Sequence, residues 1–198
     1  MTATLTLPDG RRLDLGARPL LMGVVNVTPD SFSDGGLFAD PAVAVAHGLT
    51  LARQGADIVD VGGESTRPDH TRLDAASELA RALPVITGIA AQSDIPISID
   101  TYKAEVAEAA LKAGAAIVND VWGAQREPAI AGVAARHGAP IVLMHNREEV
   151  DPDIDILAEV LRFLERSIAI ALEAGVPRSQ IVVDPGIGRF GKTAEQSL

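Results

Sequence analysis

Apolar and polar positions alternate along the chain between two kinds of segment. Short, nearly continuous apolar runs are typical of parallel strands that are covered on both faces. Six such strands are predicted, near residues 20–26, 57–61, 96–100, 115–119, 140–144 and 180–184. Segments with helical patterning lie between them, near residues 41–54, 74–91, 102–113, 127–137 and 153–174. The pattern predicts an α/β fold built from repeated strand–helix units around a parallel sheet.

The N-terminal segment differs from these units. Residues Thr4 to Leu7 and Arg12 to Leu15 flank the turn sequence Pro8-Asp9-Gly10-Arg11, which predicts a β-hairpin. In the repeated units, Gly55, Gly114 and Gly138 each stand between a helix and the next strand. Glycine adopts the left-handed conformation that closes a helix at little cost, so these residues mark the helix ends.

Polar side chains come at the carboxyl ends of nearly all the predicted strands. An open doubly wound sheet concentrates its site at one reversal of strand order, whereas a (β/α)8 barrel gathers all its strand ends around one mouth. A phosphate-binding Gly-x-Gly-x-x-Gly motif after the first strand is also absent. We therefore expect a TIM-type barrel. The residues in question are Asn26, Asp60, Asp100, Asn119, Asp120, His145, Asn146 and Asp184.

The number of units is small for a complete barrel. Such a barrel usually takes about 250 residues and eight strands. This chain has 198 residues, and six barrel strands are predicted in it. We expect residues 1–198 to form a single barrel domain that lacks the last two βα units. Strands one and six would then form open edges, which invite aggregation or pairing.

Composition and charge narrow the classes of function. An apolar fraction of 47% is that of a globular protein. The net charge of −10 argues against nucleic acid or an anionic membrane as the main partner. With no cysteine in the chain, disulfides and thiolate metal sites are excluded. The N-terminus has no signal-peptide pattern and no apolar run is long enough to span a membrane, so we expect a cytoplasmic protein.

Two polar loops carry the most specific sequence signals. The first runs from Asn26 to Gly36 and contains Pro29 and Phe32. A plain turn would not need an aromatic side chain in its middle, so we expect a lid over the barrel mouth. The second loop is Asp60-Val-Gly-Gly-Glu-Ser-Thr-Arg-Pro68, whose hydroxyls and guanidinium suit an anionic ligand. Simple surface connections remain the alternative for both loops.

Carboxylate and amide groups are predicted to ring the mouth. Asp100, Asn119 and Asp184 supply the donors and acceptors that can bind a flat, nitrogen-rich heterocycle. Taken singly, each of these residues is equally well explained as a helix cap or a turn former. Met144, Phe190 and Lys192 are candidates for a pocket wall, with the protein core or the surface as the alternative.

The motifs together resemble dihydropteroate synthase, from Leu21-Met-Gly-Val-Val-Asn-Val-Thr-Pro-Asp-Ser-Phe32 to Asp184-Pro-Gly-Ile-Gly188. The resemblance covers essentially the whole chain and rests chiefly on the two loops. It implies a folate-pathway transferase that condenses 6-hydroxymethyl-7,8-dihydropterin diphosphate with 4-aminobenzoate and releases diphosphate. It also implies small-molecule substrates, a homodimer at full length, and inhibition by sulfonamides.

The resemblance assigns roles to individual positions. Asn26, Phe32 and Arg67 take catalytic roles, and Asn26 also serves a Mg²⁺ ion bound to diphosphate. The residues of the aminobenzoate pocket are Pro29, Thr66, Arg67 and Pro68. The pterin is held by Asp100, Asn119, Met144, Asp184 and Phe190.

The chain departs from the family pattern in a few places. Arg189 is inserted before Phe190, Asp69 replaces a glycine, and Asn146 stands where many members have methionine. The expected last two units would carry a lysine for the pterin and an arginine and a histidine for diphosphate. Charge-assisted hydrogen bonds contribute roughly 1.5–3 kcal/mol each, so we expect the chain alone to be nearly inactive.

Two other functions remain open. A pterin-dependent methyltransferase shares the barrel and the Asp/Asn ring, but should lack Thr28-Pro29-Asp30-Ser31-Phe32. A non-catalytic pterin-binding remnant would retain the ring and bind pterin without forming product.

Overall fold

The computed structural model describes residues 3–16, 18–28, 40–65, 72–188 and 190–197. Its main feature is a six-stranded sheet in which every pairing is parallel. The strand order follows the chain order without a reversal, which is the order of a barrel and not of a doubly wound sheet. The strands are β3 (Met22–Asn26), β4 (Ile58–Gly62), β5 (Ile97–Asp100), β6 (Ile117–Asp120), β7 (Ile141–Met144) and β8 (Ile181–Asp184).

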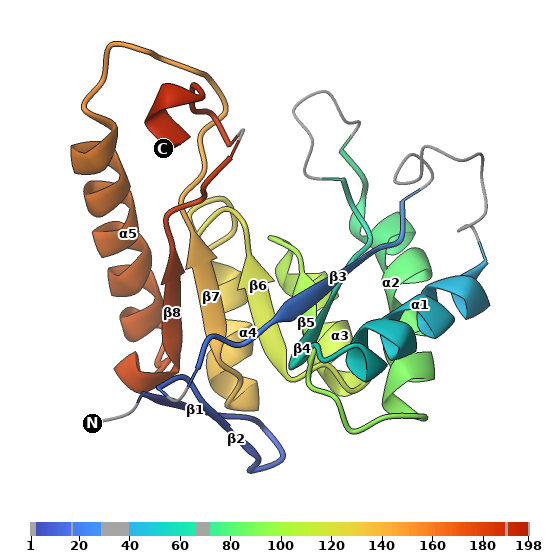
Figure 1. The fold of residues 1–198 in the computed structure, drawn as a ribbon. Coiled ribbons are helices and arrows are strands. Elements are labelled where there is room, and N and C mark those ends of the chain that lie inside the picture. The colour runs from blue at the N-terminus through green and yellow to red at the C-terminus, as the bar shows by residue number, and fades with distance from the viewer. Residues whose placement is uncertain (1–2, 17, 29–39, 66–71, 189, 198) are drawn as a thin grey trace.

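Five helices connect these strands and lie along the outside of the sheet (Figure 1). Consecutive helices pack against one another, as in the outer ring of a barrel. The predicted partial (β/α)8 barrel is therefore confirmed, with six strands in the part of the chain that the structure describes. The helices are α1 (Pro41–Arg53), α2 (Ala75–Ala90), α3 (Ala104–Lys112), α4 (Ala129–His137) and α5 (Ile156–Glu173); two short 3₁₀ helices are η1 (Arg178–Gln180) and η2 (Glu195–Ser197).

The alternation of side chains along each strand creates two separate cores. Val59 and Val61 of β4 and Ile97 and Ile99 of β5 face the helices and belong to the large core between sheet and helices. The other face is the barrel interior, where Ile117 forms part of a smaller apolar cluster. Residues of one strand therefore serve the outer core and the barrel interior in turn.

The N-terminal hairpin closes the amino end of the barrel interior. Strands β1 (Thr4–Thr6) and β2 (Arg12–Asp14) pair antiparallel, as predicted. Leu7 is 2% exposed and packs with Ile58 and Ile117 at the amino ends of the strands. The opposite end of the barrel, at the carboxyl ends of the strands, is left for the polar residues.

Helix ends follow local chemistry, which explains the small differences from the predicted bounds. The side chains of Asp40, Asp74 and Asp155 cap α1, α2 and α5, so the last of these begins at Ile156 and not near residue 153. Gly138 ends α4 with a φ of 63°, and Gly55 and Gly114 also have positive φ, as the sequence pattern predicts. Among the described residues, none of the helices has the length and apolar character to cross a membrane.

Candidate functional site at the carboxyl ends of the strands

Four residues of neighbouring strands stand in one row across the sheet. The register aligns Asn26 with Gly62, Gly62 with Asp100, and Asp100 with Asn119. Their places in the chain span 93 positions (26 to 119), yet hydrogen bonding between parallel strands brings them to one level. Asn26, Asp100 and Asn119 therefore lie together at the barrel mouth.

The glycine in this row opens space for its neighbours. A Cβ atom at Gly62 would lie 3.4 Å from Asp100 Oδ2 and 3.5 Å from Asn26 Oδ1. These two side-chain oxygens, from strands on either side of β4, thus border the same space. A larger residue at position 62 would occupy it, so glycine keeps Asn26 and Asp100 accessible to one ligand.

A buried carboxylate orients the amide of the row. Asn119 Nδ2 donates a hydrogen bond of 3.0 Å to Asp60 Oδ2, one level deeper in the barrel. Asp60 is 4% exposed, and Ser98 beside it in the register is fully buried. The contact commits the NH₂ group of Asn119 to the protein, which leaves its carbonyl oxygen for a ligand.

The carboxylates at the mouth perturb one another. Burial raises the pKa of Asp100 well above its usual value, and the negative charges of Asp60, Glu78, Asp120 and Glu64 raise it further. Burial likewise raises the pKa of Asp60. Perturbed carboxylates converging on one opening are typical of a functional site. A ligand with N–H donors or a positive charge would relieve this repulsion.

Met144 and Asp184 lie side by side on β7 and β8, beyond the row just described. The backbone carbonyl of Asp184 accepts from His145 N–H at 2.9 Å, and Asp184 Oδ1 accepts from Gly186 N–H at 2.7 Å. Met144 is buried. One oxygen of Asp184 is thus engaged in its own turn, and the roles assigned to Met144 and Asp184 stay predictions.

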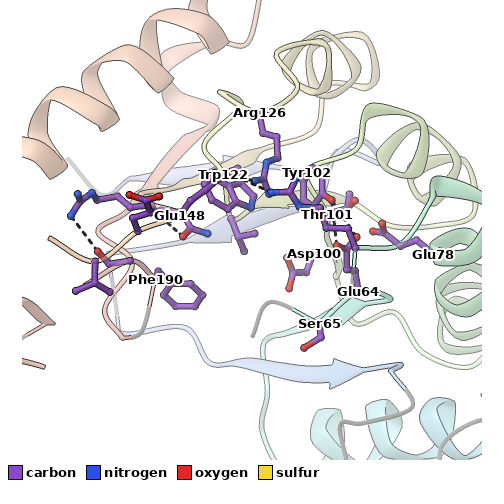
Figure 2. A pocket seen from close by; sticks show the side chains of 17 residues that line it. Glu64, Ser65, Glu78, Asp100, Thr101, Tyr102, Trp122, Arg126, Glu148 and Phe190 are labelled. Carbon is purple, nitrogen blue, oxygen red and sulfur yellow. Dashed lines mark hydrogen bonds and ion pairs between the residues drawn. The ribbon is translucent and has the colours of Figure 1, made fainter. Parts of the chain in front are cut away.

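A cavity of about 410 Å³ opens at this end of the barrel. Asp100 and Phe190 line it, which places two of the predicted pterin residues on one cavity. Figure 2 shows Phe190 on one side and Glu64, Ser65 and Glu78 on the other. Asn26, Asn119, Met144 and Asp184 are not among the residues that line it.

An aromatic wall of this cavity was missed by the sequence analysis. The guanidinium of Arg126 lies 3.7 Å from the ring centre of Trp122 and 5.2 Å from that of Tyr102. Arg126 and Arg72 both bond the carboxylate of Glu148. The chain has a single Trp and a single Tyr, and their rarity was the only sequence signal for this wall.

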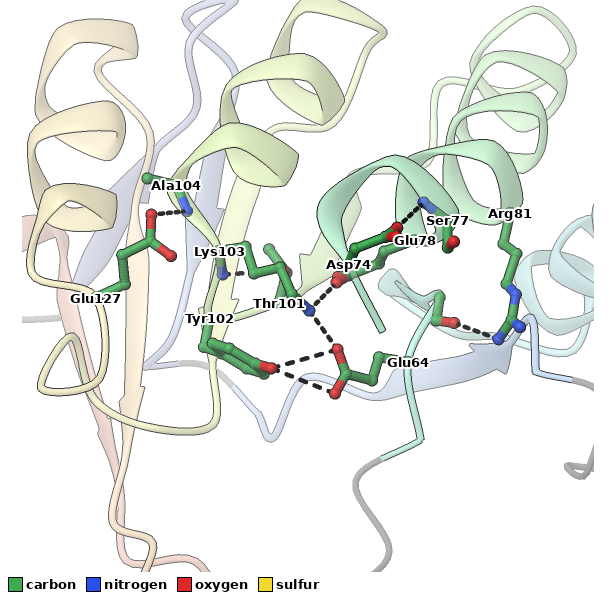
Figure 3. A network of polar contacts seen from close by, with 11 residues as sticks. Glu64, Asp74, Ser77, Glu78, Arg81, Thr101, Tyr102, Lys103, Ala104 and Glu127 are labelled. Carbon is green, nitrogen blue, oxygen red and sulfur yellow. Dashed lines mark hydrogen bonds and ion pairs between the residues drawn. The ribbon is translucent and has the colours of Figure 1, made fainter. Parts of the chain in front are cut away.

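A second group that the sequence analysis missed is a buried ionic cluster of Lys103, Glu64 and Glu78 (Figure 3). Glu64 belongs to the Gly-Gly-Glu-Ser motif, but its partner Lys103 stands just before α3 and also pairs with Glu78 of α2. Lys192, a candidate for added charge in the pocket, is buried and donates to the carbonyl of Gly186 at 2.7 Å. It braces the loop after β8 and does not line the cavity.

The predicted lid residues lie outside the described residues. These are Pro29, Phe32, Thr66, Arg67 and Pro68, together with the departures at Asp69 and Arg189. Their assigned roles stay predictions. Within the described ranges, no group of three or more His, Asp or Glu side chains forms a metal site.

Comparisons with known proteins identify the family of the chain. The model of a family described as pterin binding enzyme matches residues 22–198. Dihydropteroate synthase of Clostridium beijerinckii is 48% identical over 95% of this chain and 69% of its own length. That of Bacillus subtilis is 50% identical over 91% of this chain and 63% of its own. The chain thus spans about two thirds of the length of these relatives.

Solved structures show the same relation. Xanthomonas albilineans dihydropteroate synthase with 4-aminobenzoic acid matches with a TM-score of 0.91 and 46% identity, over 100% of this chain and 71% of that one. A Yersinia pestis dihydropteroate synthase in a sulfonamide drug complex matches with a TM-score of 0.89 and 37% identity, over 98% of this chain and 71% of that one. By sequence and by fold, this chain belongs to the pterin-binding enzymes, among the dihydropteroate synthases.

Proposed function

We propose that this chain provides the pterin-binding part of a dihydropteroate synthase, which joins 6-hydroxymethyl-7,8-dihydropterin diphosphate to 4-aminobenzoate. The observation that carries the proposal is the aligned row of Asn26, Asp100 and Asn119 beside a cavity at the barrel mouth. A relative of this chain has been solved with 7,8-dihydropteroate, the product of that reaction.

The pterin ring would lie against the carboxylate and amide groups. Asp100 accepts hydrogen bonds from ring N–H groups, and the carbonyl of Asn119 accepts a further one because Asp60 holds its NH₂ group. Asp184 would complete the ring of acceptors. Phe190, with Met144 nearby, would pack against the flat heterocycle.

The reaction needs orientation more than a strong base. The C–O bond to diphosphate breaks, and the electron-rich pterin stabilises the cationic methylene that remains. The neutral amine of 4-aminobenzoate attacks this carbon, forms the C–N bond and then releases a proton. The protein must hold the two partners together, stabilise the leaving group and exclude water. The loops that carry Pro29, Phe32, Thr66, Arg67 and Pro68 would provide the aminobenzoate pocket, where sulfonamides compete.

A magnesium ion fits the donor set at the first strand. Mg²⁺ is usually held by one or two protein oxygens, with phosphate oxygens and water completing its shell. Asn26 is exposed at the mouth, and its amide oxygen borders the space beside Gly62 that Asp100 also borders. When bound, Mg²⁺ would neutralise charge on the departing diphosphate. Asn26 would hold the ion at the edge of the pterin site.

We also propose that the full-length protein is a cytoplasmic homodimer. The resemblance to the family is what supports this assignment. Its small-molecule partners are those with which relatives have been solved, among them 4-aminobenzoic acid and pteroic acid. Size-exclusion chromatography with light scattering would measure the oligomeric state.

The direct test measures pterin binding through the quenching of tryptophan fluorescence. Trp122 is the single tryptophan, and it lines the cavity. Replacing Asp100 by Ala removes the acceptor proposed for the N–H groups of the pterin ring, so affinity should fall about 100-fold or more. Asp94→Ala, an exposed change before the amino end of β5, should leave affinity unchanged. Equal affinity of the Asp100→Ala variant and the wild type would contradict the assignment.

Turnover separates the enzyme from its non-catalytic alternative. The chain is mixed with pterin diphosphate, magnesium and 4-aminobenzoate, and dihydropteroate is measured. Product would show that the chain is an enzyme by itself. Tight pterin binding without product would support the non-catalytic alternative. A methyltransferase is disfavoured because the chain carries Thr28-Pro29-Asp30-Ser31-Phe32.

A further inference from the structure

The ammonium group of Lys103 lies between the buried carboxylates of Glu64 and Glu78, and these three residues form the ionic cluster. Lys103 stands just before α3 in an extended backbone conformation. Its Nζ forms ion pairs with Glu64 Oε2 and Glu78 Oε2 (Figure 3). The same Nζ lies 4.3 Å from the ring centre of Tyr102. Two negative charges thus share one positive charge.

The cluster is well shielded from water. The side chains of Lys103, Glu64 and Glu78 are 12%, 7% and 1% exposed. Desolvating three charges costs several kcal/mol per ion, which their mutual attraction only partly offsets. Apolar side chains of similar volume in place of the three charged ones would stabilise the fold at least equally well. Stability alone therefore does not explain a charged cluster at this place.

The cluster joins three separate elements at the base of one loop. Glu64 follows β4, Glu78 is in the first turn of α2, and Lys103 precedes α3. Tyr102 adds its hydroxyl, which donates to both oxygens of Glu64 at 3.3 and 3.4 Å. The loop that leaves β4 is thus held on two sides by groups from other elements.

The glycine before Glu64 is held just as closely. A Cβ atom at Gly63 would lie 2.9 Å from the backbone oxygen of Glu78, so the loop backbone packs directly on α2. Arg81 Nη1 donates to the carbonyl of Gly63 at 3.2 Å. Side-chain and backbone contacts therefore fix the same two residues, Gly63 and Glu64, where the loop begins.

This loop base borders the cavity. Glu64, Ser65, Glu78 and Tyr102 line it, whereas Lys103 does not. Ser65 is followed directly by Thr66-Arg67-Pro68, the segment assigned to 4-aminobenzoate. Asp100, assigned to pterin, is on β5, whereas the Lys103 ammonium pairs with Glu64 and Glu78. Lys103 therefore acts on a ligand in the cavity through its neighbours Glu64, Glu78 and Tyr102.

We infer that Lys103 is a positioning residue: by holding Glu64 against Glu78, it sets the start of the loop at Ser65 and thereby the affinity for the aminobenzoate half of the ligand. The inference rests on the proposed function, and it names a residue that positions the loop assigned to 4-aminobenzoate. Misplacement of a positioned group by about 1 Å is enough to lose a large factor in binding or rate.

The test compares two ligands, 6-hydroxymethylpterin and pteroic acid, which share the pterin and differ by the aminobenzoate. Their dissociation constants are measured at pH 8 by calorimetry for the wild type and for Lys103→Met. Because the charges of Glu64 and Glu78 also act on Asp100, Lys103→Met should weaken both ligands, and it should weaken pteroic acid about tenfold or more beyond its effect on 6-hydroxymethylpterin. Lys103→Arg keeps the charge and should restore most of the loss. Lys112→Met, an exposed lysine of α3, is the matched control.

The outcomes separate the inference from the proposed function. Equal weakening of both ligands by Lys103→Met would show a merely structural role, and unchanged affinity for both would show no role; either overturns the inference. A wild type that binds neither ligand would instead contradict the proposed function. Should Lys103→Met fail to fold, Glu64→Gln leaves Lys103 and Glu78 as a balanced pair. It should weaken pteroic acid selectively, and an unchanged affinity would overturn the inference.

Discussion

His145 shows what a single buried side chain contributes to this fold. It is fully buried at the end of β7, and neither ring nitrogen has a hydrogen-bond partner among the described residues. Its ring meets Phe163 of α5 edge to face, with centroids 4.9 Å apart. Burial lowers the pKa of His145 to about 4, and the charge of Lys192 lowers it further. The imidazole is therefore neutral in the folded protein.

We predict that this histidine makes folding sensitive to acid. The unfolded chain takes up the proton near pH 6.5 and the folded chain only near 4, so stability is full above pH 6.5. Between pH 6.5 and 4 the free energy of unfolding should fall by about 2–3 kcal/mol from this residue. His145→Phe keeps the ring contact without the titration. Urea unfolding of both proteins across this range should give diverging curves; parallel curves would contradict the prediction.

Asp120 is a second residue whose effect is local and strong. Asp120 is fully buried at the end of β6. Its carboxylate accepts hydrogen bonds from the backbone N–H groups of Trp122 and Ala124, each at 2.7 Å. These bonds stabilise a turn in which Gly123 and Ala124 both have positive φ. Burial raises the pKa of Asp120 to about 6, so the carboxylate is ionised at neutral pH. The turn places Trp122 on the cavity.

Replacing Asp120 by Ala should lower the free energy of unfolding by about 2–4 kcal/mol at pH 7.5, because two buried N–H groups lose a charged acceptor. It should also shift the emission of Trp122 and weaken pterin binding. Asp120→Asn retains one acceptor oxygen and should lose about half as much. Calorimetric unfolding and fluorescence measure both effects. A stable Asp120→Ala variant with unchanged Trp122 emission would show that other contacts hold the turn.

At the scale of whole elements, two glycines let α1 and α2 approach closely. A Cβ atom at Gly88 would lie 2.5 Å from Val45 Cγ2, and one at Gly48 would lie 2.6 Å from Ile89 Cδ1. Each helix therefore inserts a branched side chain over a glycine of the other. Glycine lowers helix propensity by about 1 kcal/mol relative to alanine, so this packing explains why both positions lack a side chain.

We predict that Gly88→Ala lowers the free energy of unfolding by about 1–2 kcal/mol, because overpacking outweighs the gain in helix propensity. In a Val45→Ala background, which vacates the space, the same change should become neutral or stabilising. Gly132→Ala in α4 is the control: its Cβ would meet only the end of the Arg136 side chain, at 3.5 Å, so it should stabilise by about 0.5–1 kcal/mol. Denaturant unfolding measures the free energy of unfolding of each variant. An equal effect of Gly88→Ala with and without Val45→Ala would contradict the prediction.

At the scale of the whole molecule, the sheet has two open edges. No described strand pairs with the outer side of β3 or of β8. Val24 on β3 and Val183 on β8 are 51% and 45% exposed, which is unusual for residues of parallel strands. Unpaired backbone groups beside exposed apolar side chains form a template for another chain.

We predict that the chain self-associates at concentrations on the order of 10 µM and above. A double variant, Val24→Lys with Val183→Lys, should reduce association because charges on edge strands oppose pairing. Leu161→Lys, on the exposed face of α5, should leave it unchanged. Light scattering after size-exclusion chromatography measures the mass. Association that responds to Leu161→Lys and not to the edge variant would place the interface elsewhere.

The sequence predicts the elements well because local rules govern them. The six barrel strands, the five helices and the hairpin were all predicted, since apolar runs, aspartate caps and closing glycines act over a few residues. Asn26, Asp100 and Asn119 were predicted to lie together because parallel strands share their carboxyl edge, and the register aligns them.

The rest of the site depends on contacts that no short-range pattern encodes. The pairs of Lys103 with Glu64 and Glu78 join residues 39 and 25 positions apart. Arg126 lies over Trp122 and approaches Tyr102 because these two residues follow the ends of the neighbouring strands β6 and β5. Lys192 looked equally suited to the pocket wall or the surface and proved to be buried on the carbonyl of Gly186.

The sequence by itself determined the family, the parallel strand–helix order and the polar character of the strand ends, because these follow from residue types and spacing along the chain. Only the tertiary structure decided which of those polar groups share a cavity, which carboxylates are buried and which cation lies between them. The physical reason is that desolvation and charge pairing depend on distances in space, and the packing of α2 and α3 on the sheet sets those distances.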